Sequence, residues 1–207
     1  MRSPQSFQHA SHPHKASSSE RILTTALDLF AVKGYDATAV REICEAARIT
    51  RPTLYHFFGS KDGVLKSLMT DAFEGFRQLV ERSLTGTCPL RDKLKTLARS
   101  SFADARKRPK LWRFMHAVVW APPGTAPPTD CSKFYESVLK LLGDAIDQAV
   151  AQGEFAPGST GVRLLVLMGT LSEAANGFVI VGRPELTPEL ADALIDTIVE
   201  GWSPSLK

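Results

Sequence analysis

Residues 47–65 read ARITRPTLYHFFGSKDGVL, and this stretch decides how the chain is organised. Thr50 is a good N-cap for a helix, and Leu54 and Phe58, four residues apart, would lie on one face of it. A helix this short is marginal in water, because isolated helices of fewer than about 12 residues rarely hold on their own. We therefore predict a short helix over residues 51–57 that Leu54 and Phe58 pin to neighbouring helices.

If those two side chains are buried, the remaining side chains of the short helix face outward. The outward residues are Arg51, Pro52, Thr53, Tyr55 and His56. Their guanidinium, hydroxyl and imidazole groups can hydrogen-bond base edges and phosphates in a major groove. The pattern therefore indicates a surface that binds DNA.

Helical periodicity continues on both sides of this stretch. Apolar residues recur at spacings of three and four from residue 20 to residue 33, and Gly34 follows as a helix-ending signal. Thr38 can cap a second helix, which runs to the short link at residues 47–50. Three helices joined in this way match a helix-turn-helix, and Ser60 can cap a long fourth helix.

Beyond this head the chain alternates helical segments with turn-rich stretches of Pro and Gly. The helical segments cover residues 90–107, 109–120, 130–152, 161–181 and 188–202. No stretch shows sustained strand alternation, so we predict an all-α chain of about nine helices. Residues 20–65 form the helix-turn-helix domain and residues 66–207 a helical body. Residues 1–19 are rich in serine and are predicted to be a disordered tail.

The charge of the chain is unevenly distributed. Residues 1–61 hold eight Lys or Arg and five Asp or Glu, so the whole net charge of +3 lies there. The rest of the chain is electrically balanced. This asymmetry suits a polyanion-binding head on a neutral body.

Cysteine spacing and hydropathy exclude several other classes of protein. Cys44, Cys88 and Cys131 lie far apart without a CxxC pair, so we expect no disulfide framework, metal site or cofactor. The most apolar stretch, residues 164–182, carries Glu173 at its centre, where a carboxylate would be costly in a bilayer. We therefore expect no membrane span and a cytoplasmic protein.

Lys61 offers a separate clue to the ligand of the head. It stands in the first turn of the fourth helix, where the helix dipole disfavours a cation. A phosphate at that helix end would make the lysine favourable, since amides, dipole and ammonium would then bind one anion. The alternative is a solvated surface lysine.

Residues 34–43, GYDATAVREI, and residues 47–65 closely resemble the DNA-binding head of TetR-family transcriptional regulators. The resemblance covers residues 21–65 and includes the signature Leu-Tyr-x-x-Phe-x-Ser-Lys-Asp. It implies a homodimer that binds a palindromic double-stranded DNA operator. It also implies that residues 66–207 are a ligand-binding and dimerisation domain, and that an unknown small-molecule effector releases the repressor.

The resemblance also assigns roles within the head by position. Thr38, Thr50, Tyr55 and Lys61 match the phosphate contacts of the family. The base-reading face is matched by Arg51, Pro52, Thr53 and His56. Arg51 is the residue that we expect to contact guanine.

Two residues depart from the family pattern. Arg48 occupies a turn position where the family usually has glycine, so we expect it to adopt a left-handed conformation and to add a phosphate contact. Cys44 replaces a small residue and is interpreted as a buried apolar group, with a redox switch as the alternative.

Aromatic residues are concentrated in the body and suggest a ligand cavity with a few polar anchors. The candidates are Phe73, Phe76, Phe102, Trp112, Met115, His116, Phe134, Glu173 and Asn176. For each aromatic residue taken alone, helical spacing makes ordinary core packing the default explanation, and only the group as a whole suggests a cavity. For Glu173, a place at the dimer surface or in a structural hydrogen bond is an equal alternative.

The eighth predicted helix is apolar around most of its circumference, which a surface helix would not be. We therefore expect the eighth and ninth helices of two chains to form a four-helix dimer interface.

Two other functions are alternatives to a regulator. A small helical enzyme is the first, yet the chain lacks GxSxG, HExxH, P-loop and GxGxxG motifs, so we expect no catalysis. A DNA-packaging protein without sequence preference is the second, and it would need a broader basic surface than a net charge of +3 provides.

Overall fold

The computed structural model describes residues 17–120 and 132–203, and within these ranges every regular element is an α-helix. The helices are α1 (Ser18–Lys33), α2 (Val40–Ala47), α3 (Arg51–Phe58), α4 (Lys61–Ser83), α5 (Leu90–Lys107), α6 (Pro109–Val119), α7 (Ser132–Ala151), α8 (Thr160–Val181) and α9 (Pro188–Glu200). The all-α prediction is confirmed. Residues 130 and 131, where the seventh helix was expected to begin, lie outside the described ranges.

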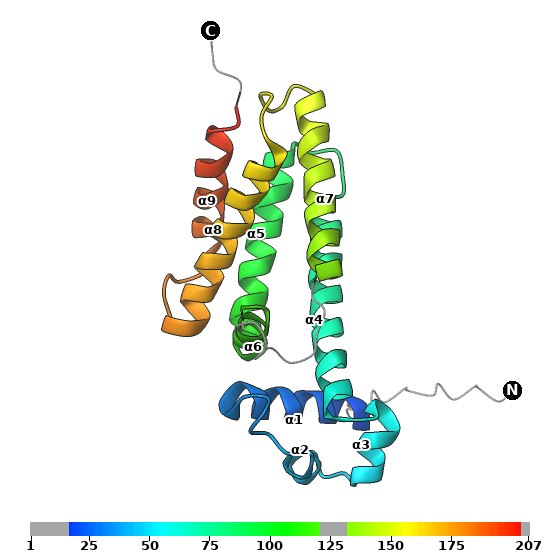
Figure 1. Cartoon of the computed structure of the whole chain (residues 1–207). Coiled ribbons are helices and arrows are strands. Elements are labelled where there is room, and N and C mark those ends of the chain that lie inside the picture. Colours follow the sequence, from blue (N-terminus) through cyan, green and yellow to red (C-terminus); the bar gives the residue numbers. More distant parts are fainter. Residues whose placement is uncertain (1–16, 121–131, 204–207) are drawn as a thin grey trace, which may run out of the picture.

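Helices α1, α2 and α3 form a small head around the first turns of α4 (Figure 1). Its core includes Ile22, Phe30, Ile43, Leu54 and Leu65, each at most 2% exposed. These residues recur at helical spacing in the sequence, which is why they fall on the inner faces of their helices. The core holds three short helices that would not be stable separately.

Two boundaries of the head differ from the predictions. Ser17 caps α1 through a capping box with Glu20, so the predicted tail of residues 1–19 is shorter than expected at its C-terminal end. The rest of that predicted tail, residues 1–16, lies outside the described residues. The N-cap of α2 is Ala39 rather than Thr38, and the Glu42 carboxylate accepts from the Ala39 amide at 3.0 Å.

The body is organised around α5, which packs against α4, α6, α7, α8 and α9. Its buried core includes Leu94, Phe102, Leu142, Ile146 and Leu167, none more than 1% exposed. Helix α4 runs from the head into this body and so connects the two cores (Figure 1). Movement of α4 would therefore affect both.

Ion pairs fix α9 against α5. Arg99 pairs with Asp192, and Lys95 and Arg91 both pair with Asp196 at 2.7 Å. The pKa of each aspartate is lowered chiefly by hydrogen bonding, to Arg99 in one case and to Lys95 in the other. Asp192 and Asp196 of α9 are thus already partnered within the chain.

Helix α8 exposes an apolar face. Val162 is 60% exposed, Leu165 74%, Val166 43% and Ile180 55%, and these positions recur at spacings of three, four and fourteen, which place them on one side of the helix. Within the described ranges α8 is also the helix that is long and apolar enough to cross a membrane, judged by length and composition only. We call the exposed residues Val162, Leu165, Val166 and Ile180 the α8 face.

The buried Leu54 gives a test of the packing of the head. Replacing it by alanine leaves a cavity in a fully buried site, so we expect Leu54→Ala to lower the free energy of unfolding by about 2–5 kcal/mol. Urea denaturation at fixed protein concentration measures the change. Val32→Ala, at a position 80% exposed on α1, is the control and should change stability little. Equal effects of the two substitutions would contradict the packing.

Candidate functional site

The short helix α3 is held and oriented as its sequence predicts. Leu54 is fully buried, and Phe58 is half-buried against the same core. Arg51, Pro52 and His56 are exposed, as is Tyr55 at 48%. Thr53 is intermediate. The helix therefore offers an uncovered polar side to a partner.

Both ends of α3 are fixed by local hydrogen bonds. Thr50 is its N-cap and accepts from the Thr53 amide at 3.3 Å, while the two threonine hydroxyl oxygens lie 2.8 Å apart. At the other end the backbone N–H of Gly59 donates to the Tyr55 carbonyl at 2.8 Å, and Ser60 then caps α4 by accepting from the Gly63 amide at 3.0 Å. A Cβ on Gly63 would lie 1.8 Å from the carbonyl oxygen of Phe58, so α3 and α4 approach as closely as only glycine permits.

Arg48 adopts the left-handed conformation predicted for it, with φ of 52° and ψ of 53°. Its backbone N–H donates to the carbonyl of Glu45 at 3.2 Å, which ends α2. The Arg48 side chain is exposed and lies in the link between α2 and α3, three residues before α3 begins. Cys44, by contrast, is buried, and burial is the main cause that raises the pKa of its thiol. This agrees with its interpretation as a small apolar group.

Lys61 has a role that the sequence did not suggest. Its ammonium donates to the carbonyl oxygens of Tyr35 at 2.9 Å and Thr38 at 3.0 Å, and it lies 4.2 Å from the centre of the Tyr35 ring. Lys61 thus ties the start of α4 to the loop before α2. A phosphate contact by Lys61 stays a prediction, and it would use the third donor of the ammonium, which lies 3.5 Å from the carbonyl oxygen of Asp36.

Thr38 is buried in this structure, and its predicted phosphate contact stays a prediction. The residue is 1% exposed, and its hydroxyl donates to the carbonyl of Gly34 at 2.8 Å. In this conformation the side chain has no donor left for a phosphate and no access to one. It stabilises the loop between α1 and α2 instead.

Phe57 is a residue of α3 that the sequence analysis missed. It is 48% exposed and lies beside the polar side of the helix. Since it stands three residues after Leu54, helical periodicity alone assigns it to the buried face. Its exposure becomes visible only when α1, α2 and α4 are in place.

The body contains a cavity of about 310 Å³ enclosed by α4, α5, α6, α7 and α8. Its apolar lining comes from aromatic, leucine and methionine side chains. These are Phe76, Leu79, Leu97, Leu111, Trp112, Met115, Phe134, Met168 and Leu171. The volume and lining are typical of a site for a small ligand.

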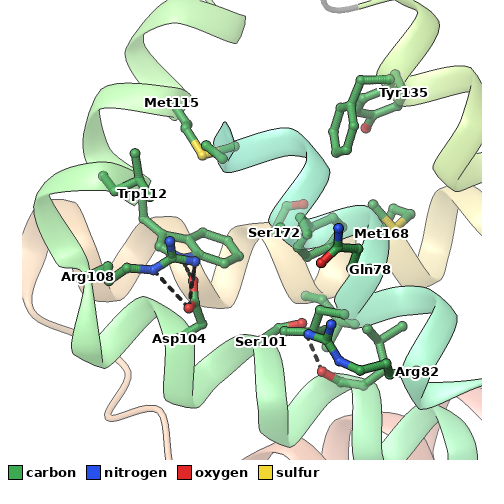
Figure 2. Close-up of a pocket in the computed structure, with 18 residues that line it drawn as sticks. Gln78, Arg82, Ser101, Asp104, Arg108, Trp112, Met115, Tyr135, Met168 and Ser172 are labelled. Carbon is green, nitrogen blue, oxygen red and sulfur yellow. Dashed lines mark hydrogen bonds and ion pairs between the residues drawn. The ribbon is translucent and has the colours of Figure 1, made fainter. Parts of the chain in front are cut away.

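The polar lining of this cavity contains one compact array (Figure 2). The Asp104 carboxylate accepts from Arg108 Nε at 2.9 Å and Trp112 Nε1 at 2.8 Å. A second guanidinium nitrogen of Arg108 donates to Asp104 at 2.8 Å. Gln78, Arg82, Ser101, Tyr135 and Ser172 supply the other polar groups.

The predicted ligand residues divide into two groups. Phe76, Trp112, Met115 and Phe134 line the cavity. Phe73, Phe102, His116, Glu173 and Asn176 do not line it. Phe73 and Phe102 are buried in the two cores, and Phe73 stacks on Phe134 with centroids 4.2 Å apart. Their rings pack in the cores, and a ligand contact by either of them stays a prediction.

The three predicted polar anchors lie outside the lining of this cavity, and their contact with a ligand stays a prediction. Glu173 is exposed on α8, and His116 and Asn176 are half-buried outside the cavity lining. The sequence analysis missed the polar lining that is present, above all Asp104 and Arg108. Their spacing of four residues was a visible signal for an ion pair on one helix face, though not for a cavity.

Comparisons with known proteins match both parts of the chain. Residues 22–68 match a family described as bacterial regulatory proteins, tetR family. The HTH-type transcriptional repressor KstR2 of Mycolicibacterium smegmatis is 30% identical over 153 residues, which is 69% of this chain and 69% of that protein. The probable HTH-type transcriptional regulator YttP of Bacillus subtilis is 26% identical over 107 residues, or 51% of this chain. That match spans 52% of YttP, about half of its length.

Solved structures share the fold over nearly the whole chain. The fatty acid degradation regulator FadR from Bacillus halodurans superposes with a TM-score of 0.78 at 21% identity, covering 91% of this chain and 98% of that one. FadR from Bacillus subtilis in complex with stearoyl-CoA superposes with a TM-score of 0.76 at 18% identity, covering 87% and 97%. At this identity the likeness concerns the fold.

Lys61 provides a test of how the head is held together. We expect Lys61→Met to lower the free energy of unfolding by about 1–2 kcal/mol, because two carbonyls lose a charged donor. Urea denaturation at fixed protein concentration measures the loss. Lys66→Met is the matched control, since Lys66 is exposed on the same helix. A loss no greater than that of the control would show that the carbonyl contacts contribute little.

Proposed function

Because this chain belongs to the TetR family of DNA-binding transcriptional regulators, we propose that it is a cytoplasmic repressor that α3 places on an operator and that a small effector releases. The uncovered polar side of α3 is the observation that carries this proposal. The family identifies a regulator of transcription rather than an enzyme.

In the proposed complex α3 enters the major groove of duplex DNA. Arg51, exposed at the first position of the helix, would donate two hydrogen bonds to a guanine. Thr53 and His56 would complete the base-reading face with Pro52. Thr50, Tyr55 and the exposed Arg48 would contact phosphates on either side.

We propose further that the protein acts as a two-fold dimer. The α8 face would be covered by the same face of a second chain, because an apolar surface of this kind is unfavourable in water. Glu173 is exposed on α8 and would lie in or beside the interface. Helix α9 would contribute less than expected from the sequence, since its Asp192 and Asp196 already pair with α5.

A dimer would place two copies of α3 about 34–36 Å apart, one helical turn of DNA, and so read a palindrome. The effector would then act by favouring a body conformation in which this spacing is wrong for the operator. FadR from Bacillus subtilis, which shares the fold, binds stearoyl-CoA. A coupling of about 1–3 kcal/mol would change operator affinity roughly 5–150-fold.

Contacts between α6 and the head support this coupling. Trp112 and Met115 of α6 line the cavity, while Phe114 and Val118 of the same helix belong to the core of the head. The Phe114 ring stacks on Phe30 of α1 with centroids 5.6 Å apart. Lys110 Nζ also pairs with Asp28 of α1 at 2.7 Å. A ligand that shifts α6 would thus change the contacts that α6 makes with α1 in the head.

Arg51→Ala tests the proposed reading of DNA. The duplex is the one that the unaltered protein selects from a random pool, and fluorescence anisotropy measures its affinity against random DNA. We expect the preference for the selected duplex to fall about 5–150-fold, because a bidentate contact with guanine is lost. Arg106→Ala, at an exposed site on the body, should bind like the unaltered protein. Unchanged discrimination by Arg51→Ala would remove Arg51 from the base-reading face.

Leu165→Glu tests the proposed dimer. Leu165 is 74% exposed in the single chain, so the substitution should not harm the fold of one chain but should place two carboxylates in an apolar interface. Sedimentation velocity should show a dimer for the unaltered protein and a monomer for this variant. Val32→Glu, on α1, serves as the control and should stay dimeric. A stable monomer of the unaltered protein at micromolar concentration would refute the interface.

A further inference from the structure

The charged groups of the body cavity determine which ligands it can hold. Asp104, Arg108 and Arg82 are the charged residues among its described lining. Asp104 and Arg108 form a bidentate pair, with nitrogen–oxygen distances of 2.9 and 2.8 Å, and Trp112 Nε1 adds a third donor to the same carboxylate. Asp104 and Arg108 therefore cancel each other's charge and satisfy each other's hydrogen bonds.

Arg82 is different because its guanidinium is uncommitted. It lies in the last turn of α4, is exposed, and makes no hydrogen bond or ion pair with its side chain among residues 17–120 and 132–203. Among the described residues, the lining of the cavity thus carries a single uncompensated positive charge. Figure 2 shows Arg82 beside Ser101, with Asp104, Arg108 and Trp112 on the other side of the view.

The neighbouring polar groups supply no competing anion. Ser101 donates its hydroxyl proton to the Leu97 carbonyl at 2.8 Å. Gln78, one turn before Arg82, donates one amide hydrogen to Glu74 at 2.9 Å and keeps a second. Glu74 itself is held by Arg77, whose hydrogen bond is the main cause of its lowered pKa. Within the described part of the chain, the end of the cavity around Arg82 therefore offers hydrogen-bond donors to an anion, and no acidic side chain there pairs with Arg82.

From these contacts we infer that the effector is an amphiphile with one anionic head, bound by Arg82, and an apolar body enclosed by Phe76, Trp112 and Phe134. The inference rests on the proposed function in that it takes this cavity as the effector site. Because Arg82 is exposed, the head stays partly hydrated, and the desolvation cost of the ion pair is small. A guanidinium–carboxylate contact is also among the strongest hydrogen bonds available.

Other ligand classes fit the cavity less well. A cation would meet the uncompensated charge of Arg82 and would have to compete with Arg108 for Asp104. A neutral apolar molecule would fill the volume of about 310 Å³ but would gain nothing from Arg82. An anionic amphiphile gains both from the charge of Arg82 and from the apolar lining of the cavity.

The anionic head can be of two kinds. It is either the carboxylate of a free acid or the phosphates of a coenzyme A thioester, which would extend out of the cavity past the exposed Arg82. Three probes separate them: dodecanoate, dodecanoyl-CoA and the neutral dodecanol. Isothermal titration of the full-length protein without DNA gives each affinity. The variants are Arg82→Met, which keeps the bulk of the chain, and Arg106→Met as the matched control on α5.

We expect the unaltered protein to bind at least one anionic probe about 10–150-fold more tightly than dodecanol, and Arg82→Met to lose that margin. Arg106→Met should keep it. The probe whose affinity falls with Arg82→Met identifies the source of the head. Equal binding of all three probes, binding of none, or an unchanged margin in Arg82→Met would overturn the inference.

These titrations are independent of operator binding. If the anionic probe binds through Arg82 but leaves the affinity for the selected duplex unchanged, the ligand class stands and the proposed release mechanism fails. If the probes release the duplex equally well with Arg82→Met, the release mechanism stands and the ligand class fails.

Discussion

The burial of Leu54 beneath α3 is the contact on which the rest of the structure depends. A helix of eight residues has too few internal hydrogen bonds to persist by itself, so its position is set by what its apolar side touches. Leu54 is fully buried in the core that α1, α2, α4 and α6 share. The same contact turns the polar side chains of α3 to the solvent. The burial of Leu54 thus both stabilises the head and leaves the polar side of α3 accessible to DNA.

The local features of the head were predictable from sequence because they depend on neighbours along the chain. The caps at Thr50 and Ser60, the left-handed Arg48 and the bounds of α5 follow from residue type and periodicity. Lys61 was not predictable in the same way, because its partners lie more than 20 residues earlier in the chain. The burial of Thr38 was not predictable for a related reason. Its burial depends on how the loop before α2 folds back on α1.

The cavity shows the limit of periodicity more sharply. Phe76 and Phe102 both stand at apolar positions of long helices, yet one lines the cavity and the other is 1% exposed in the core. Which of them faces empty space depends on the relative rotation of helices, and a single sequence does not fix this angle. The polar lining was missed because a pair such as Asp104 and Arg108 looks, along the sequence, like an ordinary surface pair.

The tight joint at Gly63 has a mechanical consequence. Since the backbones of α3 and α4 nearly touch there, and Ser60 caps α4 directly after α3 ends, the two helices are joined at a stiff angle. Helix α4 has 23 residues and is therefore about 34 Å long. A tilt of only about 5° imposed at one extremity would displace the opposite extremity by roughly 3 Å, given this length of about 34 Å. Helix α4 thus amplifies motion, because a sub-ångström shift close to one end of the helix becomes an ångström-scale displacement at its other end.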